Sequence, residues 1–115
     1  MREGAMVVRT WKGATRAGDA EAYLDYLRAT GVRAARATPG NRGVWVLRRA
    51  VGEGAAARSE LLFVSVWEDE GAVRAFAGDD PTRAVFYPED DRFLVERDEA
   101  VAHYELALAE PDVAR

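Results

Sequence analysis

A single histidine, His103, is the clearest candidate for acid–base chemistry in this sequence. Histidine is the only side chain whose ordinary pKa lets it exchange protons near neutral pH without a large perturbation. As a general base, His103 would remove a proton from a phenol or an enol. The resulting electron-rich anion can react with O2 directly, and no metal is required. The alternative is a buried histidine that makes a structural hydrogen bond.

The segment FYPEDDRFL, residues 86–94, places aromatic, acidic and basic side chains next to one another. Pro88 followed by three acids is what the first turn of a helix favours electrostatically, so a structural role accounts for the acids. A helix start does not account for Tyr87 and Arg92, which are therefore candidate catalytic groups. Arg92 would stabilise a phenolate or superoxide, or else pair with a neighbouring acid.

Aromatic side chains could form the walls of a pocket for a planar substrate. The candidates are Trp67, Trp11, Phe86, Phe76 and Trp45. Aromatic residues also supply much of the buried area of any small domain, so packing in the core is the alternative for each of them.

The composition gives no support for a bound metal or nucleotide. With one histidine and no cysteine, only an all-oxygen metal site could form, and no segment has the spacing of a calcium loop. The glycines match neither a dinucleotide fingerprint nor a phosphate-binding loop. The sequence therefore predicts a protein without a metal or a cofactor.

Length and charge narrow the class of protein. The 115 residues are enough for one domain, predicted to span 1–115. A net charge of −4 argues against a nucleic-acid surface. No apolar run approaches the length of a membrane span and the N-terminus lacks a secretory signal, so we expect no membrane partner and a cytoplasmic protein. Residues 1–58 carry a net +6 and residues 59–115 a net −10, which favours attraction between the halves or between subunits.

Apolar periodicity predicts the elements that position these residues. Alternation of apolar side chains predicts four strands, over residues 5–13, 44–51, 59–68 and 100–108. Helical spacing and capping residues predict two main helices, from Asp19 to Gly31 and from Asp69 to Gly78. Shorter helices are expected over residues 32–37, 80–86 and 87–94.

The predicted order of strand, helix, strand, strand, helix, strand is that of the ferredoxin-like βαββαβ fold, an α+β architecture. Two right-handed crossovers place both helices on one face of a four-stranded antiparallel sheet. The strand at 59–68 is apolar on both of its faces, as a strand covered on both sides is. Since the helices cover one face only, we expect a second copy of the chain to cover the other.

With this order of elements, the stretch FVSVWEDEGAVRAFAGDD resembles the antibiotic-biosynthesis-monooxygenase-like proteins of the dimeric α/β-barrel superfamily. The similarity runs over about residues 4–108. Its strongest local piece is a third strand ending in Trp67, followed by an acidic turn and a helix that carries Phe76. The resemblance implies a homodimer whose two sheets pack together, with a pocket between helices and sheet in each subunit.

The resemblance is compatible with several chemistries, because a fold does not fix a reaction. Some relatives oxygenate anthrone- or quinol-type aromatics with O2 and no metal or flavin, some bind haem and open its ring, and others have no assigned reaction. Haem-degrading relatives use a first-strand Asn, a third-strand Trp and a His after the second helix. Only Trp67 matches, because the sole asparagine, Asn41, is predicted in a loop and residues 69–86 contain no histidine.

The leading prediction is a cofactor-independent monooxygenase that acts with O2 on a phenolic, quinol-like or anthrone-like aromatic. In it, His103 is the base, the aromatic residues form the walls, and Tyr87 and Arg92 make the polar contacts. The rival prediction is a non-catalytic protein of the same fold that binds a small molecule or haem.

Overall fold

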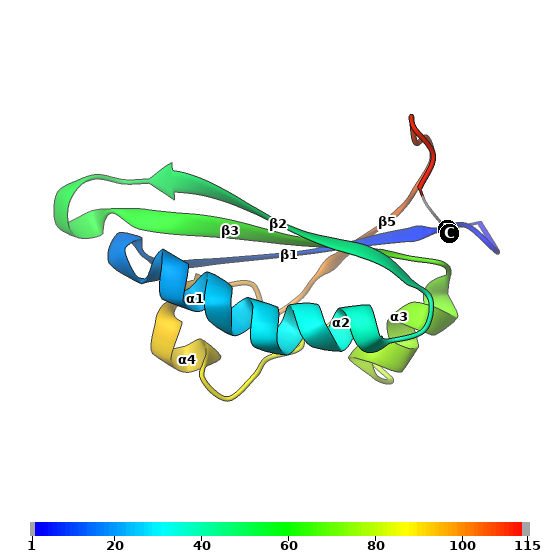
Figure 1. Cartoon of the computed structure of the whole chain (residues 1–115), viewed down its shortest axis with the longest axis horizontal. Helices are drawn as coiled ribbons and strands as arrows, with labels where there is room; N and C mark the ends of the chain where they lie inside the picture. The colour runs from blue at the N-terminus through cyan, green and yellow to red at the C-terminus, as the bar shows by residue number, and fades with distance from the viewer. Residues whose placement is uncertain (1, 114–115) are drawn as a thin grey trace.

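The computed structural model describes residues 2–113 as one antiparallel sheet with helices packed on a single face (Figure 1). The strands run in the order β2-β3-β1, and two short strands, β4 and β5, share the remaining edge of β1. Their bounds are β1 Val7–Arg16, β2 Asn41–Val51, β3 Arg58–Trp67, β4 Leu94–Arg97 and β5 Ala102–Glu105. The predicted α+β class and ferredoxin-like order are confirmed.

The predicted last strand over residues 100–108 is wrong in its extent. The edge of β1 is occupied by two short strands because the backbone between them turns away to pair with an earlier loop. Ala84 N donates to Glu99 O, and Val101 N donates to Thr82 O. This pairing ties the loop at 79–89 to the sheet edge.

The first helical stretch consists of α1 Ala20–Leu27, a wide turn over Arg28–Val32 and α2 Arg33–Ala37. The prediction that Gly31 ends the helix is wrong, since Gly31 is buried inside that wide turn. The helix ends at Thr38, whose backbone is extended with ψ 125°. Thr38 precedes a proline, which disfavours helical backbone in the preceding residue.

The second main helix, α3 Glu70–Ala77, is confirmed together with both of its predicted ends. The Asp69 carboxylate accepts a hydrogen bond of 2.9 Å from Ala72 N, as an N-cap does. Gly78 follows the helix with φ +89°, a conformation that glycine adopts without the cost of a β-carbon.

The helix expected over residues 80–86 does not form. The Asp80 carboxylate accepts hydrogen bonds from both the backbone and the hydroxyl of Thr82, which closes a local turn. Beyond it the chain is irregular until the short helix α4 Asp90–Phe93. The result is a loop over residues 79–89 that lies against the helix-covered face of the sheet.

The core between sheet and helices has two parts. One cluster is formed by Val7, Ala35, Trp67, Ala72 and Val73. The other is formed by Tyr23, Leu27, Leu61 and Phe93. None of the helices within residues 2–113 is both long and apolar enough to cross a membrane.

The other face of the sheet carries large exposed apolar side chains. Trp45, Leu47 and Tyr104 are 52%, 53% and 58% exposed, and Leu62 stands opposite Leu47 on the neighbouring strand. Figure 1 shows no described element over this face. Exposed apolar surface of this kind marks an interaction site, so the predicted homodimer remains the partner that we expect there.

Leu47→Lys is expected to convert the protein from a dimer into a 12.7 kDa monomer, because a lysine ammonium is costly to bury in an apolar interface. Sedimentation velocity at micromolar concentration measures the change. Glu53→Lys, at an exposed position of the β2–β3 connection, is the control and should leave the dimer intact. A parent protein that sediments only as a monomer would contradict the homodimer.

Candidate functional site

A cavity with aromatic walls lies between the sheet, α1 and the loop at 79–89. The walls are formed by Trp11, Phe63, Phe76, Phe86 and Tyr87. Three polar side chains also border it, those of Arg9, Tyr23 and Asp90. The aromatic enclosure with a few convergent polar groups is typical of a small-molecule site.

The cavity is small in this conformation. Its volume is about 40 Å³, whereas a cavity that accepts a single benzene ring measures about 150 Å³. Val85, Phe86 and Tyr87, three of the residues that border it, belong to the loop at 79–89. A planar aromatic ligand therefore requires this loop to move outward.

Arg9 is a buried cation on β1, with 5% of its surface exposed. Its guanidinium donates to the carbonyl oxygens of Pro81 and Arg83, the latter at 3.0 Å, and contacts His103 Nε2 at 2.9 Å. No carboxylate within residues 2–113 forms an ion pair with it. Burial lowers the Arg9 pKa to about 10, so the side chain is still a cation at neutral pH. Arg9 also lies 5.9 Å from the centre of the Phe76 ring.

His103 lies on β5 directly opposite Arg9, on the helix-covered face of the sheet. It borders a second cavity of about 80 Å³, together with Glu70, Arg74 and Pro81. His103 does not border the aromatic cavity. Burial, and then the charge of Arg9, lower the His103 pKa below its ordinary value, while Glu70 acts in the opposite direction. The neutral ring accepts from Arg9 through Nε2, which places its proton on Nδ1.

The free energy of unfolding should fall as the pH drops below 6.5. In that range the unfolded His103 binds a proton more readily than the folded one, because the folded pKa is the lower of the two. His103→Gln removes the titrating group and should flatten this part of the profile. Urea unfolding at several pH values between 5 and 7.5 measures it. An equal acid slope in the two proteins would contradict the lowered pKa.

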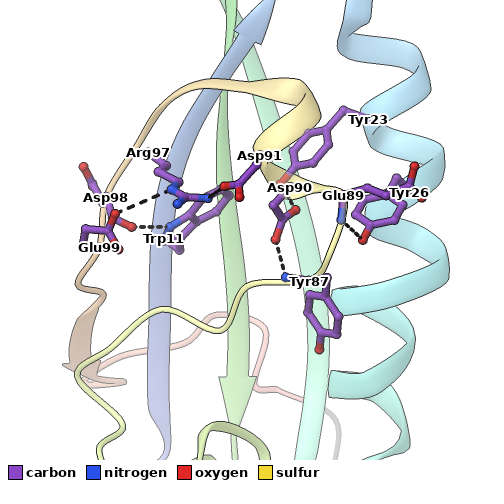
Figure 2. Close-up of polar contacts among 10 residues, drawn as sticks. All are labelled: Trp11, Tyr23, Tyr26, Tyr87, Glu89, Asp90, Asp91, Arg97, Asp98 and Glu99. Carbon is purple, nitrogen blue, oxygen red and sulfur yellow. Dashed lines mark hydrogen bonds and ion pairs between the residues drawn. The ribbon is translucent and has the colours of Figure 1, made fainter.

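Asp90 is a buried carboxylate at the cavity, with 3% of its surface exposed. It accepts hydrogen bonds from the Tyr23 hydroxyl at 2.9 Å and from Tyr87 N at 2.6 Å. Figure 2 shows the carboxylate between helix α1 and the loop that carries Tyr87. Burial, followed by the charge of Asp90, raises the Tyr23 pKa, so this hydroxyl remains a donor at neutral pH.

The predicted site residues divide into those at the cavity and those elsewhere. Trp11, Phe76, Phe86 and Tyr87 border the aromatic cavity. Trp11 packs edge-on against Phe86 at 6.1 Å, and its indole N–H donates to Asp98 O. Burial raises the Tyr87 pKa.

The other predicted residues lie outside this cavity. Trp67 is fully buried beside Phe76, and its indole N–H donates to Ser65 Oγ at 2.8 Å. Trp45 points from the opposite face of the sheet. Arg92 is exposed and pairs with Glu89 at 2.8 Å. The structure thus separates these three side chains from the aromatic cavity.

Asn41 does not lie in a loop as predicted but begins β2, opposite Trp67. Its buried side chain accepts from Arg36 at 2.9 Å and from Gly43 N at 3.1 Å. These contacts stabilise the irregular start of β2 and give the Asn41 side-chain oxygen its hydrogen-bond donors within the fold. Asn41 does not border the aromatic cavity.

Three polar residues at the cavity, Arg9, Tyr23 and Asp90, were not among the sequence candidates. Arg9 carries a usable signal, since it alternates with Val7 and Trp11 on the inward side of its strand. A charged residue among the inward-facing residues of a strand is unusual enough to indicate a buried charged group. Asp90 carries no such signal, because three consecutive acids all fit a helix start.

No family model matches the sequence, and no curated protein matches it. Solved structures share its fold. A Bacillus cereus protein provisionally named an antibiotic biosynthesis monooxygenase is 18% identical, with TM-score 0.64, covering 92% of this chain and 97% of that one. NE2512, a Nitrosomonas europaea protein of unknown function, is 18% identical, with TM-score 0.62 and coverages of 94% and 95%. The haem-degrading protein Rv3592 of Mycobacterium tuberculosis is 22% identical, with TM-score 0.53 and coverages of 91% and 96%.

At these identities the comparisons establish a shared fold. The chain has the architecture of the antibiotic-biosynthesis-monooxygenase-like proteins, as the sequence resemblance implied. Proteins that share this fold are named for different functions, so the reaction must be argued from the side chains at the cavity.

Proposed function

We propose that the protein is a cofactor-independent monooxygenase that acts with O2 on a phenol-, quinol- or anthrone-type aromatic bound in the aromatic cavity. The observation that carries the proposal is the buried Arg9 guanidinium, which borders an aromatic cavity and pairs with no carboxylate of residues 2–113. A nearby cation in a water-poor site lowers the pKa of a bound phenol or enol. The resulting anion is the form that reacts with O2.

For an anthrone the atoms balance without a further reactant. The ring methylene loses one proton to a base, and the carbanion gives one electron to O2. The two radicals combine to a peroxide at the former methylene carbon, and loss of water converts that carbon to a carbonyl. One oxygen atom of O2 stays in the quinone, and the other leaves as water with both methylene hydrogens.

Two groups can take the substrate proton. Asp90 borders the cavity directly, and His103 is neutral and adjoins Arg9 from the neighbouring cavity. We propose His103 as the base, which requires Nε2 to be released from Arg9 because Nδ1 already carries the ring proton, and Tyr87 as a polar contact at the cavity wall. Pro81 belongs to the loop at 79–89, and a shift of this loop would join the two cavities.

Oxygen consumption with an anthrone in chelator-treated buffer tests the proposal. We expect uptake above the spontaneous rate, one O2 per anthrone, and accumulation of the corresponding anthraquinone. His103→Ala should slow the reaction if His103 is the base, and an unchanged rate would assign the proton to Asp90. Saturable binding of aromatic ligands without oxygen uptake would favour the non-catalytic binding protein.

Haem is a second candidate ligand, because two of the solved structures that share this fold are described by haem degradation or by bound protoporphyrin. The residues present do not fit it. Iron at His103 Nε2 would have to displace the Arg9 guanidinium and lie beside a second cation. A porphyrin is also much larger than an anthrone, so the loop at 79–89 would have to open further than the proposed substrate requires. A haem titration should show no Soret shift, and a stoichiometric shift would contradict this conclusion.

A further inference from the structure

The aromatic cavity has opposite charges at its two ends. Arg9 packs over Phe76, which belongs with the core cluster around Trp67. Asp90 is bound by Tyr23, which belongs to the other core cluster. The cavity lies between these clusters and is bordered by side chains of both. A buried cation and a buried carboxylate therefore face the same aromatic space from different sides.

The register of the sheet separates the two core clusters along the strands. Arg9 stands opposite Ser65, and Gly13 stands opposite Leu61, the residue that packs in the cluster of Tyr23. Four residues of strand separate these two levels, so the two charged groups belong to different levels of the core. A ligand that contacts both needs a polar group at each end.

Each charged end has capacity left for a ligand. The Asp90 carboxylate accepts two hydrogen bonds and has about four lone-pair sites, so it can accept more. No cation within residues 2–113 forms an ion pair with it. Arg9 is held by two backbone carbonyls and a neutral imidazole, none of which cancels its charge. An anionic group can therefore bind at Arg9, and a hydroxyl can donate to Asp90.

We infer that the cavity selects an aromatic that carries an ionisable oxygen at one end and a neutral hydroxyl at the other. Arg9 binds the ionised oxygen, and Asp90 accepts a hydrogen bond from the hydroxyl. The inference rests on the proposed function in taking this cavity as the substrate site, and it adds the substrate class. Asp90 is then the specificity-determining residue, because a buried carboxylate repels a second anion and accepts from a donor.

A ligand that loses the remote hydroxyl should bind about 10- to 100-fold more weakly, which is the usual worth of a hydrogen bond to a charged group. The matched probes are 6-hydroxy-2-naphthoate, 2-naphthoate and 6-methoxy-2-naphthoate. Each carries a permanent anion for Arg9 at pH 7, and only the first carries a donor for Asp90. Isothermal titration calorimetry under identical conditions gives the three dissociation constants.

In the parent protein we expect 6-hydroxy-2-naphthoate to bind tightest, with the methoxy compound no better than 2-naphthoate. In Asp90→Asn the preference for the hydroxyl should shrink toward unity. Asp91→Asn changes the neighbouring, exposed acid of the same helix and should keep the preference, which separates the loss of Asp90 from a general change in charge. Equal binding of the three probes by the parent would overturn the inference, and so would an undiminished preference in a folded Asp90→Asn.

The probes are not oxygenated through an anthrone methylene, so this test is independent of turnover. Oxygen uptake with anthrone, combined with equal binding of the three probes, would overturn the inferred substrate class but not the proposed monooxygenase activity. The hydroxyl preference without oxygen uptake would support the substrate class and remove the oxygenase.

Discussion

Arg9→Met is expected to lower kcat/KM for anthrone oxidation by about 10²- to 10³-fold, the usual cost of removing one preorganised electrostatic contact to the developing anion. Methionine fills much of the space of the arginine stem and carries no charge that must be desolvated. Stability should therefore change less than activity. Oxygen uptake gives the rate, and thermal unfolding of the same preparation shows whether the fold is retained.

The matched control for this substitution is Arg28→Met, on the exposed surface of the first helical stretch. It removes the same charge at a position remote from the cavity and should leave the rate unchanged. Since the Arg9 pKa is about 10, binding of 2-naphthoate to the parent should also weaken as the pH rises through 10, when the cation is lost. Equal rates in the parent and in a folded Arg9→Met would contradict the role given to Arg9.

Asp90→Ala is expected to lower the free energy of unfolding by about 2–6 kcal/mol, because it leaves two donors without their acceptor, each worth about 1–3 kcal/mol. The donors are the Tyr23 hydroxyl, which is buried, and the backbone N–H of Tyr87. The substitution should also free the end of the loop at 79–89. Urea unfolding measures the stability, and limited proteolysis within residues 79–89 measures the release of the loop.

Asp91→Ala is the matched control, since it removes the neighbouring acid. Asp91 is exposed and contacts Arg97 at 2.5 Å on the surface, where an ion pair contributes about 0–1 kcal/mol. A loss for Asp91→Ala as large as that for Asp90→Ala would show that burial does not distinguish the two acids. Figure 2 shows them pointing to different surroundings from the same short helix.

Periodic elements could be predicted from the sequence, because local patterns determine them. β1, β2 and β3, the cap at Asp69 and the stop at Gly78 follow from alternation and capping chemistry, whereas β4 was not predicted. The order of elements then restricted the topology to one common fold. Gly31 failed as a stop signal because tertiary packing buries that glycine within a continuing helix.

The candidate site was predicted less completely. It depends on a loop without regular secondary structure and on which face of the sheet each strand side chain joins. β2 is apolar on both faces, so its sequence does not show which face Trp45 joins. The loop at 79–89 has no periodic pattern. Its position depends on contacts of its backbone with Glu99, between β4 and β5, and with the Arg9 side chain of β1. Arg9 lies in an inward row, but only the fold reveals that carbonyls and an imidazole surround it.

The central position of β1 has a consequence for how the protein is made. Arg9 contacts His103, which follows it by 94 residues, and β1 pairs with three strands that all come later in the chain. Contacts of such long range close slowly, since the chain must first lose the freedom of the intervening loop. During synthesis the first strand must wait for β3 before it pairs, and for β5 before its arginine is enclosed. The cavity is therefore among the last parts of the molecule to form, and a nascent chain that stops short of residue 103 lacks the imidazole that faces Arg9.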